Sequence, residues 1–107
     1  MAKYFISASY SDEGARGLRK DGGTKREHVT RLAIESLGGK LESFYFAFGA
    51  EDVVVIADFP DAVSAAALSV AIGTTGAARC RTTQLLTPAD MDKAVSKSSA
   101  YRAPGHD

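Results

Sequence analysis

The residues best suited to chemistry lie around one short turn near the middle of the chain. Tyr45, Phe46 and Phe48 lead into a glycine, and Glu51 and Asp52 follow it. Aromatic side chains beside carboxylates can bind a small organic ligand or a cation. Two buried carboxylates can also share one proton and act as acid and base. The alternative interpretation is an apolar strand that ends in a solvated acidic turn.

Arginines provide a second candidate site, on a segment close to residue 80. Arg79, Arg81 and Thr83 alternate with small residues, so they share one side of a predicted strand. If Arg81 faces a cavity, it can hold a carboxylate through two hydrogen bonds. The alternative is that these arginines pair with acidic side chains of a second subunit. We therefore predict that a small organic ligand contacts Tyr45, Phe46, Phe48, Asp52 and Arg81.

The other reactive side chains carry weaker signals. Cys80 is either a nucleophile or a small apolar side chain in a strand, and we favour the second interpretation. His28 has Arg31 and Leu32 at the positions where a helical metal site needs its second ligand. The basic residues around Lys20 lack the spacing of a phosphate-binding loop. The sequence therefore predicts no metal site and no cofactor, and it assigns no catalytic residue.

The charge balance limits the classes of partner. Thirteen basic and thirteen acidic side chains give a formal net charge of zero, which predicts no general attraction to nucleic acid or to acidic membranes. The N-terminus has no secretory pattern, and no apolar run reaches the length of a membrane span. With a single cysteine, these features predict a cytoplasmic protein whose partners include neither nucleic acid nor a membrane.

Apolar periodicity predicts the elements that position these residues. Strands are expected at 3–10, 41–48, 52–59 and 77–86, and helices at 13–20, 25–37, 62–73 and from 88. Thr24, Asp61 and Thr87 are the predicted N-caps of the last three helices. The predicted buried faces are Val29, Leu32, Ala33, Ser36 and Leu37 in the first long helix, and Val63, Ala66, Ala67, Val70 and Ala71 in the second.

The order of these elements is β, α, β, β, α, β, followed by a short helix. With right-handed crossovers it predicts a ferredoxin-like α+β fold. Its four-stranded antiparallel sheet carries both long helices on one face. We expect one domain over residues 1–95 and a polar, mobile tail over 96–107.

The hairpin of residues 41–59 is predicted to be apolar on both faces. Strict alternation places Phe44, Phe46 and Phe48 on one side, and Leu41 and Tyr45 on the other. Covering such aromatic surface is worth several kcal/mol at about 25 cal/mol per Å². We therefore expect a homodimer or a larger homo-oligomer, most simply one that packs sheet on sheet. The alternative is a monomer whose final helix crosses the open face.

Three segments resemble the GYD-domain family: residues 38–49 with Asp52, residues 63–68 and residues 83–87. The likeness extends from Lys3 to about Ala94. The family is named after a Gly-Tyr-Asp tripeptide, and the corresponding stretch here, residues 49–52, reads Gly-Ala-Glu-Asp without the tyrosine. The resemblance implies similarity to dimeric α/β-barrel proteins. That class includes cofactor-independent monooxygenases, haem-degrading enzymes and ligand-sensing effector domains.

These observations favour an oligomeric module that binds a small ligand or has a regulatory or accessory role. The reason is that no nucleophile–base pair and no cofactor cradle can be identified. The alternative is a cofactor-independent oxygenase or isomerase of the barrel class, which needs only a shaped cavity and one or two polar groups. A third possibility is a structural assembly protein, so whether the chain is an enzyme stays open.

Overall fold

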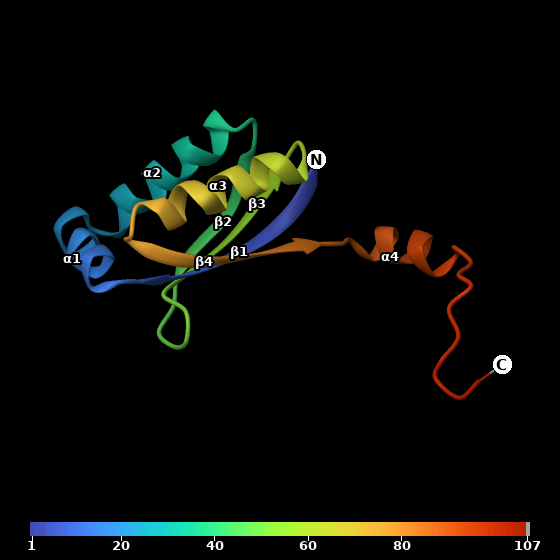
Figure 1. Ribbon diagram of the computed structural model, residues 1–107. Helices are drawn as coiled ribbons and strands as arrows, with labels where there is room; N and C mark the ends of the chain where they lie inside the picture. Colours follow the sequence, from blue (N-terminus) through green and yellow to red (C-terminus); the bar gives the residue numbers. More distant parts are fainter. Residues whose placement is uncertain (107) are drawn as a thin grey trace.

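Two helices cover one face of a four-stranded sheet and leave the other face open in the computed structural model, which describes residues 1–106 (Figure 1). The elements are β1 (Ala2–Tyr10), α1 (Asp12–Asp21), α2 (Gly23–Ser36), β2 (Lys40–Phe46), β3 (Val53–Phe59), α3 (Ala62–Thr74), β4 (Ala78–Leu85) and α4 (Pro88–Val95). The sheet has the order β2-β3-β1-β4, and all of its pairs are antiparallel. The predicted ferredoxin-like α+β fold is confirmed, with an additional helix, α1, before α2.

The core lies between the sheet and helices α2 and α3. Ile34 of α2 and Phe59 of β3 are its largest fully buried side chains. The Phe59 ring meets the Tyr4 ring edge to face, with 5.7 Å between the ring centres. The predicted apolar side of β1, which includes Tyr4 and Ile6, is therefore the side that faces the helices.

A β-bulge in β2 corrects the predicted faces of the hairpin. Leu41 pairs with Ala57, but the next paired residue is Ser43, opposite Ile56, so Glu42 is the extra residue. The bulge reverses the alternation after it. Phe44 and Phe46 consequently lie on the same face as Leu41, toward the helices, and Tyr45 lies on the open face. Phe48 follows the strand, in the loop.

The start of α2 differs from the prediction. Gly22 is the N-cap, and no side chain caps this helix, so Thr24 is not the cap. Gly22 has φ of 83°, a left-handed conformation that favours glycine, and its N–H donates to the carbonyl of Leu18. Glycine therefore ends α1 and starts α2 with no loop between them, in place of the expected cap at Thr24.

The buried faces of both long helices are also rotated from the predicted ones. In α2 the predicted residues Ala33 and Leu37 do pack against the core, but the fully buried residue is Ile34, and Leu32 is 53% exposed. In α3 Ala65 and Leu68 are buried, whereas Val63 and Val70 are exposed. Since α3 consists of small or apolar side chains around its whole circumference, its periodicity does not indicate which face packs.

Asp61 caps α3 as predicted, and this cap depends on pH. Its Oδ1 accepts a hydrogen bond from the Ser64 N–H, 2.7 Å away, which lowers the pKa of the Asp61 carboxyl below its ordinary value of 3.8. Because the pKa is lower in the folded state, this stabilisation is present above pH 3.8 and is lost as the pH falls through the folded pKa. Asp61→Asn keeps an N-cap acceptor without a charge. Its melting temperature should therefore fall less steeply than that of the wild type below pH 3.8, as measured by circular dichroism. Identical acid slopes would contradict the assignment.

Candidate functional site

Asp52 and Glu51, the predicted acidic pair, fasten the β2–β3 loop to the end of β1. The Tyr10 N–H donates to Asp52 Oδ2 at 2.8 Å, and the Ser9 hydroxyl donates to Glu51 Oε2 at 2.9 Å. The backbone of Asp52 adds a hydrogen bond from its N–H to the Ala8 carbonyl. Each carboxylate thus accepts a hydrogen bond from its own donor on β1, and the two bonds hold the β2–β3 loop against the end of that strand.

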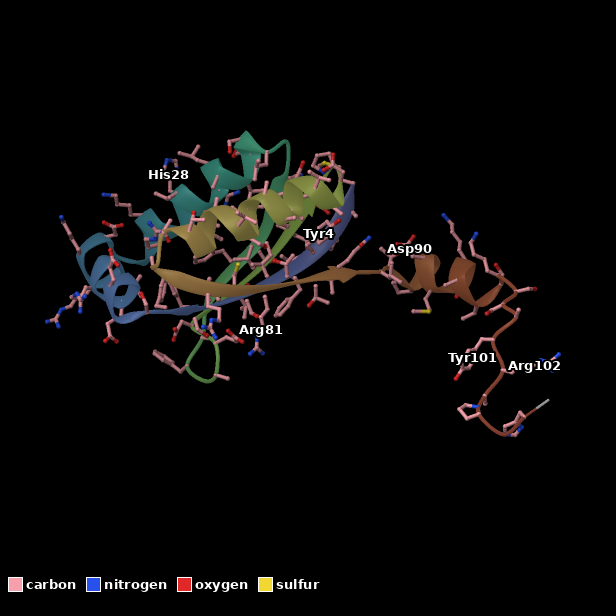
Figure 2. All side chains as sticks on the ribbon, in the orientation of Figure 1. Tyr4, His28, Arg81, Asp90, Tyr101 and Arg102 are labelled. Atoms are coloured by element: carbon pink, nitrogen blue, oxygen red, sulfur yellow. The ribbon has the colours of Figure 1, made fainter. Side chains whose placement is uncertain are left out.

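The five predicted ligand contacts do not gather at one point. Tyr45 is 68% exposed on the open face of the sheet. Arg81 lies on the same face, below β4 in Figure 2, on the side away from the helices. Phe46 packs on the other face, where its ring meets that of Phe44 edge to face. Phe48 is fully exposed in the loop. A common ligand for these residues stays a prediction.

The open face carries three zones across its strands. At one end Lys3 donates to Glu42 and Asp58, with 3.0 Å between nitrogen and oxygen in both pairs. These hydrogen bonds, the one to Glu42 first, raise the pKa of the Lys3 ammonium above its ordinary value. The middle zone carries the apolar side chains of Phe5, Tyr45, Val54 and Ile56 together with the polar Ser7, Ser43 and Thr83. Arg81 pairs with Ser7 beside this zone, and Arg79 lies toward the opposite end.

A cavity of about 260 Å³ lies on the other side of the sheet, beneath α2 and α3. The sheet contributes Ile6, Val53 and Val55 to its lining, and the helices contribute mainly apolar side chains such as Ile34 and Leu68. A largely apolar concave space with a few polar groups is the usual form of a small-molecule site.

Small residues create this space. Alanines line the cavity from four elements: Ala8 in β1, Ala33 in α2, Ala71 in α3 and Ala78 in β4. An alanine side chain fills less volume than a leucine or an isoleucine side chain would, so each of these positions leaves space between the packed elements. The sequence analysis did not identify this site. The four alanines are far apart in the sequence, and their convergence depends on the tertiary packing.

Arg26 and Tyr10 are the polar side chains of the cavity lining that remain suited to contact a ligand. The two threonines of the lining are already engaged, because Thr30 Oγ1 donates to the Arg26 carbonyl and Thr75 Oγ1 donates to the Ile72 carbonyl. Arg26 Nη1 lies 3.5 Å from Asp21 Oδ2. Arg26 and Tyr10 therefore accompany two engaged threonines in a lining that is otherwise apolar.

A second, more open depression lies at the end of β4 near the start of α1. Its lining is mostly polar and includes Ser9, Ser11, Arg79 and Arg81. One of the predicted ligand contacts, Arg81, belongs to this lining. The Ser11 hydroxyl donates to the carbonyls of Gly76 and Ala77 at this corner, and Gly14 of α1 lies close to the same Ala77 carbonyl oxygen.

The remaining candidates from the sequence are dispersed. Cys80 lies on the helix-facing side of β4, with its Sγ 3.9 Å from the Ser69 carbonyl oxygen. His28 is exposed on the outer surface of α2, far from the sheet (Figure 2). Within residues 1–106, no three metal-binding side chains come together. No helix in the same part of the chain is long and apolar enough to cross a membrane.

Fold and site together define a ferredoxin-like α+β domain with an apolar cavity between its helices and its sheet. The chain belongs to the GYD-domain family, since the family profile matches residues 4–95. The predicted resemblance is thereby confirmed over nearly the whole chain. No curated protein sequence matches this chain.

Two solved structures are similar to the chain in fold. The crystal structure of MtbAldR superimposes with a TM-score of 0.58 at 17% identity, over 80% of this chain and 52% of that one. The leucine response regulatory protein LrpA of Mycobacterium tuberculosis gives a TM-score of 0.51 at 22% identity, over 80% of this chain and 51% of that one. This chain thus spans about half the length of either protein. At such identities the likeness establishes the fold alone.

Proposed function

We propose that this protein is a homo-oligomeric module that binds a small organic ligand and serves a regulatory or accessory role. The observation that carries the proposal is the apolar cavity beneath α2 and α3. The fold shared with a leucine response regulatory protein supports it by analogy. The apolar zone of the open sheet face, including Phe5 and Ile56, supports self-association, because such surface is normally covered.

The lining defines the ligand's chemistry. Its apolar walls favour a ligand with a compact apolar body, since burial from water is worth about 25 cal/mol per Å². Arg26 supplies the one cationic group of the lining. The ligand we propose is therefore a small apolar organic anion, such as a carboxylate or a sulfonate, whose charged end pairs with Arg26.

Binding of anilinonaphthalene sulfonate, an apolar fluorophore with one anionic group, tests the cavity directly. Titration of the wild type should give a saturable rise in fluorescence. Ala33→Leu places a larger side chain in the cavity and should weaken binding at least about tenfold, which corresponds to about 1.4 kcal/mol. Ala67→Leu makes the same change at an exposed position of α3 and is the matched control.

Arg26→Gln separates the charge of the site from its shape. The variant should weaken binding of the sulfonate about tenfold or more, because a charge-assisted hydrogen bond is lost. Equal binding by the wild type and Ala33→Leu would place the dye elsewhere and would refute the cavity as the site. Equal binding by the wild type and Arg26→Gln would refute the anionic ligand.

A further inference from the structure

Helix α4 continues outward from the end of β4, away from the sheet and from α2 and α3 (Figure 1). All of its eight residues are exposed. Its start is nonetheless fully formed, because Thr87 and Asp90 form a reciprocal capping box and Pro88 occupies the first turn. An isolated helix of this length is marginal in water. A helix that is fully capped but packs against no other described element needs a partner to stabilise it.

One side of this C-terminal arm, residues 86–97, is apolar. Leu86 precedes the N-cap and Met91 is the fourth residue of the helix, which are the positions of a hydrophobic staple. Val95 lies one turn beyond Met91 on the same side. These three side chains are 56%, 49% and 75% exposed. The arm therefore presents a continuous apolar stripe to solvent.

The open face of the sheet complements this stripe. Its middle zone offers apolar side chains, among them Phe5, Val54 and Ile56. Arg79 and Arg81 border that zone, and neither forms an ion pair within residues 1–106. The arm carries two acidic side chains, although Lys93 and Lys97 balance them in its total charge.

The acidic residues of the arm lie within α4. Asp90 and Asp92 flank Met91, beside the apolar stripe. Placing the stripe on the middle zone of a sheet would bring these carboxylates toward the bordering arginines. Opposite charges around an apolar contact fix its orientation more than its strength.

The path of the chain argues for a second copy as the partner. Only Leu86 and Thr87 connect β4 to α4, and Thr87 is extended, with φ of −74° and ψ of 162°. To reach its own sheet, α4 would have to reverse direction within two residues, neither of them a glycine. A second copy offers the same face without that reversal, and exchange of two arms gives two identical contacts.

We propose that the C-terminal arm of one chain docks through Leu86, Met91 and Val95 onto the open sheet face of a second copy. This inference rests on the proposed homo-oligomer and specifies what covers the open face. It replaces neither the cavity nor its ligand, which lie on the other side of the sheet.

Cross-linking between two different chains tests the proposal. In a Cys80→Ser background, a chain with Ala94→Cys in the arm is mixed with a tagged, longer chain with Thr83→Cys on the open face. Oxidation should join the two different chains in a disulfide. Ala67→Cys, on the outer surface of α3, replaces Thr83→Cys in the matched control and should give little product.

Sedimentation equilibrium of variants of the whole chain provides a second, independent test. Met91→Asp places a charge in the stripe and should raise the dimer dissociation constant at least about thirtyfold. Lys93→Asp changes the charge more, but on the opposite side of the helix, and should change that constant less than about threefold.

The outcomes separate the two proposals. A wild type that oligomerises without the Ala94–Thr83 cross-link, and without sensitivity to Met91→Asp, overturns arm docking and leaves homo-oligomerisation intact. A wild type that is monomeric at micromolar concentration overturns both. An intrachain cross-link in a dilute chain carrying both cysteines shows that the arm folds back, and it also overturns the exchange.

Discussion

Replacement of Phe59 by alanine is expected to lower the free energy of unfolding by about 3–5 kcal/mol. Phe59 is fully buried at the end of β3, and its ring packs edge to face against Tyr4. Truncation removes the aromatic contact and leaves a cavity that neighbouring backbone cannot fill. Since small domains unfold with about 5–15 kcal/mol in total, the variant should melt about 15 °C or more below the wild type.

Phe48→Ala is the matched control for this change. The same side chain is removed, but Phe48 is fully exposed in the β2–β3 loop. The free energy of unfolding should change by no more than about 0.5 kcal/mol. Urea titrations at one protein concentration provide the comparison, because self-association makes stability depend on concentration. Equal effects of the two substitutions would show that Phe59 does not anchor the core.

Gly14→Ala should destabilise the fold by about 3 kcal/mol or more. Gly14 is buried in the first turn of α1, where a Cβ would overlap the Ala77 carbonyl oxygen and lie 2.9 Å from the Tyr10 ring. That carbonyl is backbone and also accepts the Ser11 N–H at 2.9 Å. An added methyl group would therefore push α1 away from β4, and loss of the Ser11 contacts would follow.

Gly17→Ala is the control on the same helix. A Cβ at Gly17 meets no atom within 4 Å. Alanine in a helix interior is more favourable than glycine by about 0.5–1 kcal/mol, so this variant should be slightly more stable than the wild type. Far-UV circular dichroism during urea unfolding measures both variants. A Gly14→Ala protein as stable as the Gly17→Ala protein would contradict the close approach.

The sequence predicted the order of elements well, because each has a local signal. Asp61 and Thr87 cap their helices as expected, and β1 alternates as expected. The signals that failed depend on distant packing. Gly22 took the place of Thr24 because two helices adjoin there, and Ile34 is buried because α2 is rotated against the sheet.

The candidate site was less predictable than the fold. Asp52 stood out as a carboxylate beside aromatic residues, yet its role in the structure is to hold the Tyr10 N–H. The cavity depends on alanines such as Ala8 and Ala71, whose side chains carry no chemistry of their own. Their small side chains leave space unfilled, and this space becomes a cavity only where the four elements pack together.

The extra residue at Glu42 affects how this chain can be compared with its relatives. Deleting Glu42 would remove the bulge and leave the pairs of Ser43, Phe44 and Tyr45 with β3 unchanged, so that each side chain would keep its face but shift by one position relative to Leu41 in the sequence. A homologue that lacks the bulge should show aromatic residues at the opposite parity of the strand. Alignments therefore need a single-residue gap at this position. Without it, a residue that lines the cavity beneath α2 and α3 in one protein would be equated with a surface residue in the other.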